Sequence, residues 1–208
     1  MSDAPTLIPT LIPTLILASQ SASRRAMLTD AGVPFTPMAA MVDEDSAKQA
    51  LADLSPRDLA DALAELKAVK IATQVPGALV LGSDSLVALA DGTRLDKPVD
   101  RDDAARHLRA MSGGIHDLWS AAVIAENGRA VWRQVDRARL HVRPLGDAFI
   151  NRYLDAEWPA IAGCVGCFRV EGPGVQLFNR VEGSHFTILG MPLLPVLAYL
   201  RERKVMPA

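Results

Sequence analysis

The 208-residue chain lacks an excess of basic residues, since 22 Lys and Arg face 24 Asp and Glu for a net charge of −2. A near-neutral balance provides no electrostatic footprint for duplex DNA or an anionic membrane. We therefore expect neither nucleic acid nor membrane as a partner. Any affinity for phosphate must come from a local cluster of basic side chains.

Cysteine is scarce as well. The only two, Cys164 and Cys167, form a Cys-Val-Gly-Cys pair. A redox dithiol needs a strand-to-helix setting, and a zinc site needs a second pair or nearby histidines. The segment instead has the pattern of a glycine-rich loop entering a strand. We expect an incidental, reduced pair, which fits a cytoplasmic protein.

No stretch rich in Gly, Ser or Pro divides the chain, and its only repeat is an early Thr-Leu-Ile-Pro. No Lys or Arg precedes this repeat, and Pro9 and Pro13 interrupt it, unlike a secretory signal. It is also too short to span a bilayer. We expect residues 1–14 to be a poorly structured extension and residues 15–208 to form one domain.

Caps and turns predict an α/β fold with a mixed sheet and flanking helices. Ser21 or Ser23 caps a helix to about Ala31, and Ser55-Pro56 starts another. Further helices are expected at 100–113, 147–156 and 192–204, and strands at 15–18, 35–42, 78–90, 93–97, 116–126, 129–142 and 175–181. Because helices and hairpins interleave, the sheet is expected to be mixed rather than purely parallel.

Ser19-Gln20-Ser21-Ala22-Ser23-Arg24-Arg25 lies where a strand feeds a helix. Free backbone N–H groups at a helix start attract anions, and hydroxyl and guanidinium groups add donors for phosphate oxygens. The alternative is a hydroxyl-rich cap with two solvated arginines. Two arginines in a first turn oppose the helix dipole, which favours a bound anion as compensation.

Asp84 lies within the apolar strand segment Leu-Gly-Ser-Asp-Ser-Leu-Val. Burying a carboxylate there without a partner is costly. It is either a structural aspartate satisfied by hydrogen bonds or a catalytic carboxylate that binds metal or accepts a proton.

Two further charged positions accompany it. The Asp91-Gly92 turn folds the chain back and brings Lys97 near Asp84, where it either neutralises a phosphate or is an edge-strand charge. Glu44, in the acidic break Asp43-Glu44-Asp45, is either a magnesium ligand or part of a solvated turn.

Seven motifs succeed one another along the chain: Leu17-Ala18-Ser19-Gln20-Ser21 with Arg24-Arg25, Asp43-Glu44, Lys67-Ala68, Gly82-Ser83-Asp84-Ser85, Lys97-Pro98, Ser112-Gly113 with His116, and Gly190-Met191-Pro192-Leu193. The motifs and their order resemble those of the Maf family, also called septum-formation inhibitor proteins. The resemblance extends from Leu15 to about Leu200. The resemblance implies a Maf/Ham1-like fold with a cleft between two lobes, and a homodimer.

It also implies hydrolysis of a nucleoside triphosphate to the monophosphate and pyrophosphate, dependent on a divalent cation (Mg, Mn or Co). Asp84 would accept the proton of the attacking water. Ser19, Arg24, Glu44, Lys67 and Lys97 would line the phosphate and metal site, with Glu44 and Asp84 as metal ligands. Lys67 falls beside a helical stripe of Leu59, Leu63 and Leu66, which permits it to reach the cleft.

Three family positions that tune base choice correspond to Ser23, Ser85 and Glu171. The resemblance at Glu171-Gly172 is to the branch that acts on 7-methyl-GTP, and a carboxylate suits a base edge that presents N–H donors. That branch carries Trp and Gln where this chain has Ser23 and Ser85. The usual Asp-Lys-Ala-Gly is replaced by Ala160-Ile161-Ala162-Gly163.

We therefore expect a pyrophosphatase that clears non-standard or modified nucleotides. The first alternative is an enzyme specific for 7-methyl-GTP. The second is a non-catalytic, nucleotide-binding regulator of cell division. A phosphatase that removes only the terminal phosphate is the enzymatic rival.

Overall fold

The computed structural model describes residues 13–207. The predicted extension, 1–14, falls almost wholly on residues outside this range. The strands are β1 (Leu15–Leu17), β2 (Thr36–Pro37), β3 (Leu79–Leu89), β4 (Arg94–Leu95), β5 (Ile115–Glu126), β6 (Arg129–Val142) and β7 (Phe178–Glu182). The helices are α1 (Ala22–Asp30), α2 (Glu44–Ala50), α3 (Pro56–Ala72), α4 (Arg101–Met111), α5 (Asp147–Glu157), the 3-10 helix η1 (Pro173–Leu177), α6 (His185–Ile188) and α7 (Leu193–Glu202).

The seven strands form one mixed sheet in the order β2-β1-β3-β5-β6-β7, with β4 paired to β3. β1 is parallel to both β2 and β3, whereas β5, β6 and β7 follow as antiparallel neighbours. The predicted mixed sheet is therefore confirmed. β3 is buried along almost its whole length, as its continuous apolar run indicated.

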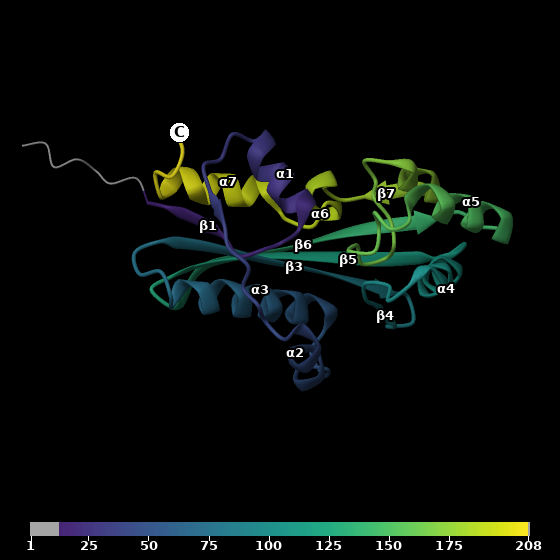
Figure 1. Ribbon diagram of the computed structural model, residues 1–208, viewed down its shortest axis with the longest axis horizontal. Coiled ribbons are helices and arrows are strands. Elements are labelled where there is room, and N and C mark those ends of the chain that lie inside the picture. Colours follow the sequence, from purple (N-terminus) through teal and green to yellow (C-terminus); the bar gives the residue numbers. More distant parts are fainter. Residues whose placement is uncertain (1–12, 208) are drawn as a thin grey trace, which may run out of the picture.

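Helices cover both faces of the sheet around β3 (Figure 1). Side chains alternate along a strand, so Val80 packs into the cluster with α3 while Leu79 and Leu81 pack with α1 and α7 on the other face. Gly82 allows the closest approach, since a Cβ there would lie 2.2 Å from the Ala64 carbonyl oxygen of α3. No larger residue fits without displacing α3.

A separate core cluster joins α4 and α5 to the far ends of the long strands, through residues such as Leu108, Leu140 and Ile150. The fold thus has two lobes that share the sheet, with a cavity between them, as expected. Within residues 13–207, no helix has both the length and the apolarity needed to cross a bilayer.

The predicted helix starts are largely correct. The side chain of Ser21 accepts a hydrogen bond from the Arg24 backbone N–H, and Ser55 does the same for Asp58. Both are the N-cap geometry that these sequences favour. The two predicted hairpins, β3–β4 and β5–β6, are also present.

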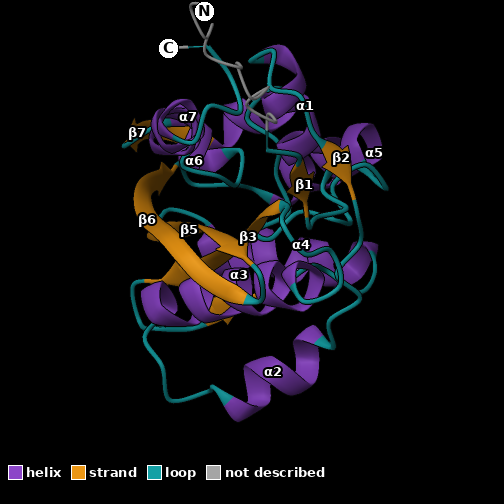
Figure 2. Cartoon of the chain, turned by 90° about the vertical axis from the view of Figure 1, so that its left-hand side faces the viewer, coloured by secondary structure: helices purple, strands orange, loops and turns teal. Residues whose placement is uncertain are grey.

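The acidic segment around Glu44 is a helix rather than a solvated turn. Asp43 caps it by accepting from the Ser46 N–H, and Glu44 and Asp45 occupy its first turn, where acidic groups complement the helix dipole. α2 has no fully buried residue and projects beyond α3 (Figure 2). The sequence of α2 has too few apolar residues to show the periodicity that predicts a helix.

Two other boundaries were wrong, and one short helix was not predicted. The expected strand over 175–181 begins only at Phe178, because Pro173 starts a 3-10 helix, so the cysteine loop does not enter a strand directly. The extended segment expected over 35–42 pairs only at Thr36–Pro37. α6 has four residues and was missed.

The buried face of α3 differs from the predicted leucine stripe. Leu59 and Leu63 are buried, but Leu66 is 42% exposed. Lys67, four residues after Leu63 on the same face of the helix, is buried in place of Leu66. Its side chain turns toward the cavity. A lysine thus completes an otherwise apolar face.

Candidate functional site

The site lies where β3 lacks a neighbour along one edge. β1 pairs with β3 only as far as Leu81, and β4 begins to pair at Val87. Within the described chain, no strand covers the edge of residues 82–86 between them. Because Asp84 and Ser85 are consecutive, their side chains lie on opposite faces of β3, and both reach the opening.

The opening leads into a cavity of 850 Å³. Every predicted site residue lines it: Ser19, Ser23, Arg24, Glu44, Lys67, Asp84, Ser85, Lys97 and Glu171. The structure therefore brings together residues from six separate parts of the chain. Their individual roles remain predictions.

Arg24 is buried at the base of the cavity. Its Nε donates to the Gly190 carbonyl oxygen at 2.8 Å, and its Nη2 donates to Ser85 Oγ at 3.0 Å. Within residues 13–207 no carboxylate forms an ion pair with it. Desolvation lowers the pKa of Arg24 despite the attraction of Asp84 and Glu44. A buried cation held only by neutral acceptors is costly and offers its charge to an anion.

The Gly190 carbonyl oxygen connects the arginine to the sheet, because it also accepts from Ser83 Oγ at 3.0 Å. Gly190 has φ +106°, a conformation that favours glycine. A Cβ there would lie 3.4 Å from Arg24 Nε. The glycine thus lets the main chain approach the guanidinium.

Two serines beside Arg24 differ in what they offer a ligand. Ser19 Oγ accepts from Arg24 Nη1 and from the Ser21 N–H, so its own proton is free to be donated. Ser120 donates its proton to the Thr187 carbonyl oxygen, so Ser85 must donate to Ser120 or to Gly190. Ser85 can therefore only accept from a ligand.

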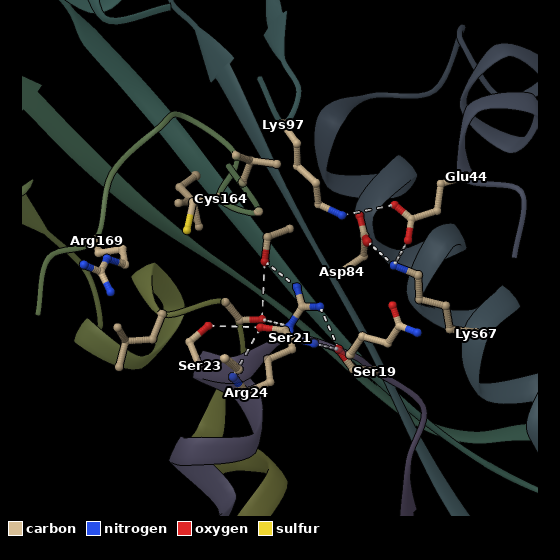
Figure 3. A pocket seen from close by; sticks show the side chains of 18 of the residues that line it. Ser19, Ser21, Ser23, Arg24, Glu44, Lys67, Asp84, Lys97, Cys164 and Arg169 are labelled. Carbon is tan, nitrogen blue, oxygen red and sulfur yellow. Dashed lines mark hydrogen bonds and ion pairs between the residues drawn. The ribbon is translucent and has the colours of Figure 1, made fainter. Parts of the chain in front are cut away.

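Lys67 lies between two carboxylates, as Figure 3 shows. Its Nζ is 2.6 Å from Asp84 Oδ1 and 2.7 Å from Glu44 Oε1. Asp84 is buried, and its Oδ2 makes no hydrogen bond to any described residue and is reachable by water. Burial favours the neutral form of Glu44, but Lys67, Lys97 and Lys48 together outweigh it, and the pKa of Glu44 is lowered. Lys67 thus holds the two carboxyl groups side by side in the cavity.

Lys97 lies at the mouth of the cavity. Its Nζ is 3.9 Å from Glu44 Oε2, and its side chain is 55% exposed. A cation so loosely held can reorient toward an incoming ligand. The prediction that the β3–β4 turn carries Lys97 toward Asp84 is confirmed.

Sequence reasoning missed two cations of the lining, Lys48 and Arg169. Lys48 is four residues after Glu44 on α2 and pairs with Asp96. The spacing of four residues from Glu44 places Lys48 on the same helix face, but this inference requires that α2 is first recognised as a helix. Arg169 precedes Glu171 by two residues, in a loop without regular structure.

Arg169 is held by a buried acid. Its Nε and Nη2 donate to the same oxygen of Glu157, Oε2, at 3.0 and 2.9 Å. Glu157 is only 4% exposed, and these hydrogen bonds raise the pKa of Arg169. Three guanidinium N–H groups remain for a ligand, because five are present and two are engaged.

Both cysteines are free thiols. Cys164 lines the cavity beside Arg169 (Figure 3), whereas Cys167 is buried and contacts His107 Nδ1 at 3.3 Å. Burial raises the pKa of Cys164 and raises that of Cys167 to about 12. Near neutral pH both stay protonated and are weak nucleophiles.

The donor set suits a hard divalent cation that also binds the ligand. Glu44 and Asp84 flank Lys67 Nζ with one carboxylate oxygen each, and each keeps a second oxygen for a cation. The described chain holds no group of three or more His, Cys, Asp or Glu arranged for a metal ion. Mg²⁺ typically uses one or two carboxylates together with substrate phosphates. The two residues fit this mode and not a preformed protein cage.

Comparison with known proteins agrees with this geometry. The profile of the Maf-like protein family matches residues 14–203. The chain belongs to the Maf-like family. A nucleoside triphosphate pyrophosphatase of Sphingopyxis alaskensis is 53% identical over 193 residues, which cover 92% of this chain and 98% of that protein.

Two further proteins are similar to this chain. A 7-methyl-GTP pyrophosphatase of Rhizobium meliloti is 49% identical over 89% of this chain and 94% of its own. Among solved structures, a nucleoside-triphosphatase (dITP/XTP pyrophosphatase) of Mycobacterium abscessus aligns with a TM-score of 0.45 and 14% identity, over 91% of this chain and 97% of that one.

Proposed function

We propose that this Maf-like protein hydrolyses a nucleoside triphosphate between its α- and β-phosphates, releasing the monophosphate and pyrophosphate. The observation that carries the proposal lies in one cavity. There a buried Arg24, which forms no ion pair with any described carboxylate, lies together with an Asp84 whose free oxygen reaches water. The names of relatives about half identical to the chain support it.

The triphosphate binds through cations and hydroxyls. Arg24 supplies the buried charge, Ser19 donates its free proton, and the start of α1 contributes backbone N–H groups. Lys97 moves onto the outer phosphates from the mouth. These groups stabilise the negative charge that develops on the leaving pyrophosphate.

Asp84 activates water. Lys67 is paired with Oδ1, which leaves Oδ2 to accept the proton of the attacking water. The water oxygen forms a bond to phosphorus at the α–β anhydride, and the bridging P–O bond breaks. The proton held by Asp84 is then released to solvent.

Glu44 and Asp84 would hold a divalent cation together with the phosphates. When bound, Mg²⁺, Mn²⁺ or Co²⁺ supplies positive charge to the phosphate oxygens. Because the protein provides only two carboxylates, we expect Mn²⁺ to bind far more tightly with nucleotide present than without it. Titration calorimetry with and without a non-hydrolysable triphosphate measures this difference.

Product analysis tests the proposal. The protein is incubated with a panel of common and modified triphosphates and Mg²⁺, Mn²⁺ or Co²⁺, with EDTA as the control. We expect equal amounts of monophosphate and pyrophosphate, and none with EDTA. Orthophosphate plus diphosphate would instead identify a terminal phosphatase, and binding without turnover would identify a regulator.

A narrower alternative is specificity for 7-methyl-GTP. The exposed carboxylate of Glu171 in the cavity wall would attract a cationic base, and the Rhizobium meliloti relative bears that name. Arg169 lies in the same wall and opposes a positive charge there. The preference between a neutral and a positively charged base therefore depends on whether the attraction of Glu171 or the repulsion of Arg169 is stronger.

A further inference from the structure

The cavity has an end remote from Asp84, formed by the loop after α5. Arg169 and Cys164 lie there, across the cavity from Asp84, Lys67 and Glu44 (Figure 3). As proposed above, the triphosphate occupies the end that holds Arg24, Lys67 and Lys97, here called the phosphate end. Its base must then extend toward this loop, here called the base end. The loop residues are therefore the ones that meet the base.

Arg169 is unusually well fixed for a side chain that is 37% exposed. Glu157 holds Nε and Nη2 through a single buried oxygen, which fixes the plane of the guanidinium. The free N–H groups lie on Nη1 and Nη2, and they form a fork of two parallel donors. Such a fork matches two adjacent acceptors on a planar ligand.

Of the three residues that the family resemblance assigns to base choice, the one in this loop is an acceptor. Glu171 is a carboxylate, and it is close enough to influence both Arg169 and Cys164 electrostatically. Ser85 lies beside Arg24, whose Nη2 donates to its Oγ at 3.0 Å, and so lies away from this loop. The base end thus combines one donor fork with a carboxylate acceptor.

Guanine complements this set better than the other common bases. It presents O6 and N7 as adjacent acceptors on one edge, and N–H donors on the edge beside it. Adenine replaces the O6 acceptor with a donor, and the pyrimidines have no N7. Methylation of N7 removes one acceptor and adds a positive charge.

We propose that Arg169, positioned by Glu157, is a specificity-determining residue that donates to O6 and N7 of a guanine base carrying a free N7. This inference rests on the proposed function for its assignment of the two ends of the cavity. It predicts that GTP is preferred over ATP, over 7-deaza-GTP, which lacks N7, and over 7-methyl-GTP.

The test combines a change in the protein with a change of one atom in the substrate. Wild type and Arg169→Met are assayed with GTP, 7-deaza-GTP, 7-methyl-GTP and ATP. In wild type we expect kcat/KM for GTP to exceed that for 7-deaza-GTP by roughly tenfold. In Arg169→Met this ratio of kcat/KM values should fall to about one. The ratio of kcat/KM for GTP to kcat/KM for 7-methyl-GTP should also decrease, whereas kcat/KM for ATP should stay unchanged.

Three control variants isolate the cause. Arg169→Lys keeps the charge without the fork, so it should lose most of the preference for N7. Glu157→Gln should lower the preference partly, as expected of a positioning residue. Arg109→Met removes a comparable surface pair with Asp147, away from the cavity, and should change nothing.

Failure of the inference and failure of the proposed function give different results. If no triphosphate is cleaved by wild type, the proposed function is wrong, and calorimetric binding of GTP and 7-deaza-GTP to the same variants still tests Arg169. If Arg169→Met lowers GTP and ATP turnover equally, Arg169 contacts the phosphates and the inference is overturned. An unchanged GTP to 7-deaza-GTP ratio overturns it as well.

Misfolding is distinguished by a double variant. Arg169→Met leaves the buried Glu157 without its partner, which is destabilising. Arg169→Met with Glu157→Gln removes that charge and should recover the Tm without recovering the preference for N7. A return of the preference would show that Arg169 acts only on stability.

Discussion

The two ends of the cavity are built in different ways. The phosphate end takes its charged groups from β3, α1 and α3, where Asp84, Arg24 and Lys67 are buried and fixed by neighbouring elements. The base end is a loop, and its charged groups Arg169 and Glu171 are partly or fully exposed. Chemistry common to all triphosphates needs a rigid frame, whereas a loop can vary with the base without disturbing that frame.

The largest expected effect is at Asp84. Asp84→Asn keeps the size of the side chain but loses the proton acceptor, so kcat should fall by roughly 10²- to 10⁴-fold. The Tm should fall moderately, because Lys67 loses one of its two carboxylate partners and keeps Glu44, and nucleotide binding by calorimetry should persist. A variant with near wild-type turnover would remove Asp84 from the mechanism.

Acid should weaken the lobe that supports the base end. Burial lowers the pKa of His116 to about 4, from 6.5, and its ring packs 5.8 Å from Phe168 of the loop. Between these pH values the unfolded chain binds a proton that the folded chain does not. The free energy of unfolding should therefore decrease by about 3 kcal/mol as the pH falls from 6.5 to 4.

Urea unfolding at pH 7 and pH 4.5 checks this. His116→Gln cannot titrate, so its dependence on pH should be flatter than that of wild type. His185→Gln removes an exposed histidine and should retain the wild-type slope. Equal slopes for all three proteins would assign the acid sensitivity elsewhere.

Arg24 should show that the phosphate end favours function over stability. Arg24→Met removes a buried charge that has no carboxylate partner, so the Tm without nucleotide should stay the same or rise. Loss of a charged hydrogen bond to phosphate should lower kcat/KM by roughly 10- to 100-fold. A large fall in Tm would mean that Arg24 is chiefly structural.

The smallest effect is expected at Lys97, the exposed cation of the phosphate end. Lys97→Ala should lower kcat/KM by up to roughly tenfold, because a half-exposed charge is screened by water. Its ion pair with Glu44 adds little stability, so the Tm should be unchanged. Arg57→Ala, on the outer surface of α3, is the matched control.

The sequence predicted the phosphate end well because regular structure positions it. The place of Arg24 follows from a capping serine, that of Asp84 from an apolar strand, and that of Lys97 from an Asp-Gly turn. Lys67 was harder, since the leucine stripe favoured Leu66 as the buried residue. A hydrophobic pattern cannot show that an ion pair with Asp84 makes burial of a lysine favourable.

The base end was predicted poorly for the opposite reason. Its loop has no periodicity, so nothing indicated that Arg169 would meet Glu157, twelve residues earlier on α5. Lys48 was missed because α2 was interpreted as a turn. Glu171 was found only through the family resemblance.

The uncovered edge of β3 has a consequence for how the fold tolerates change. The opening exists because one neighbouring strand ends at Leu17 and the other, which runs antiparallel, ends at Leu95. A few added residues of pairing on either side would seal it with ordinary main-chain hydrogen bonds and would make the sheet more complete. Strand length, as much as side-chain identity, therefore keeps this protein open to its ligand.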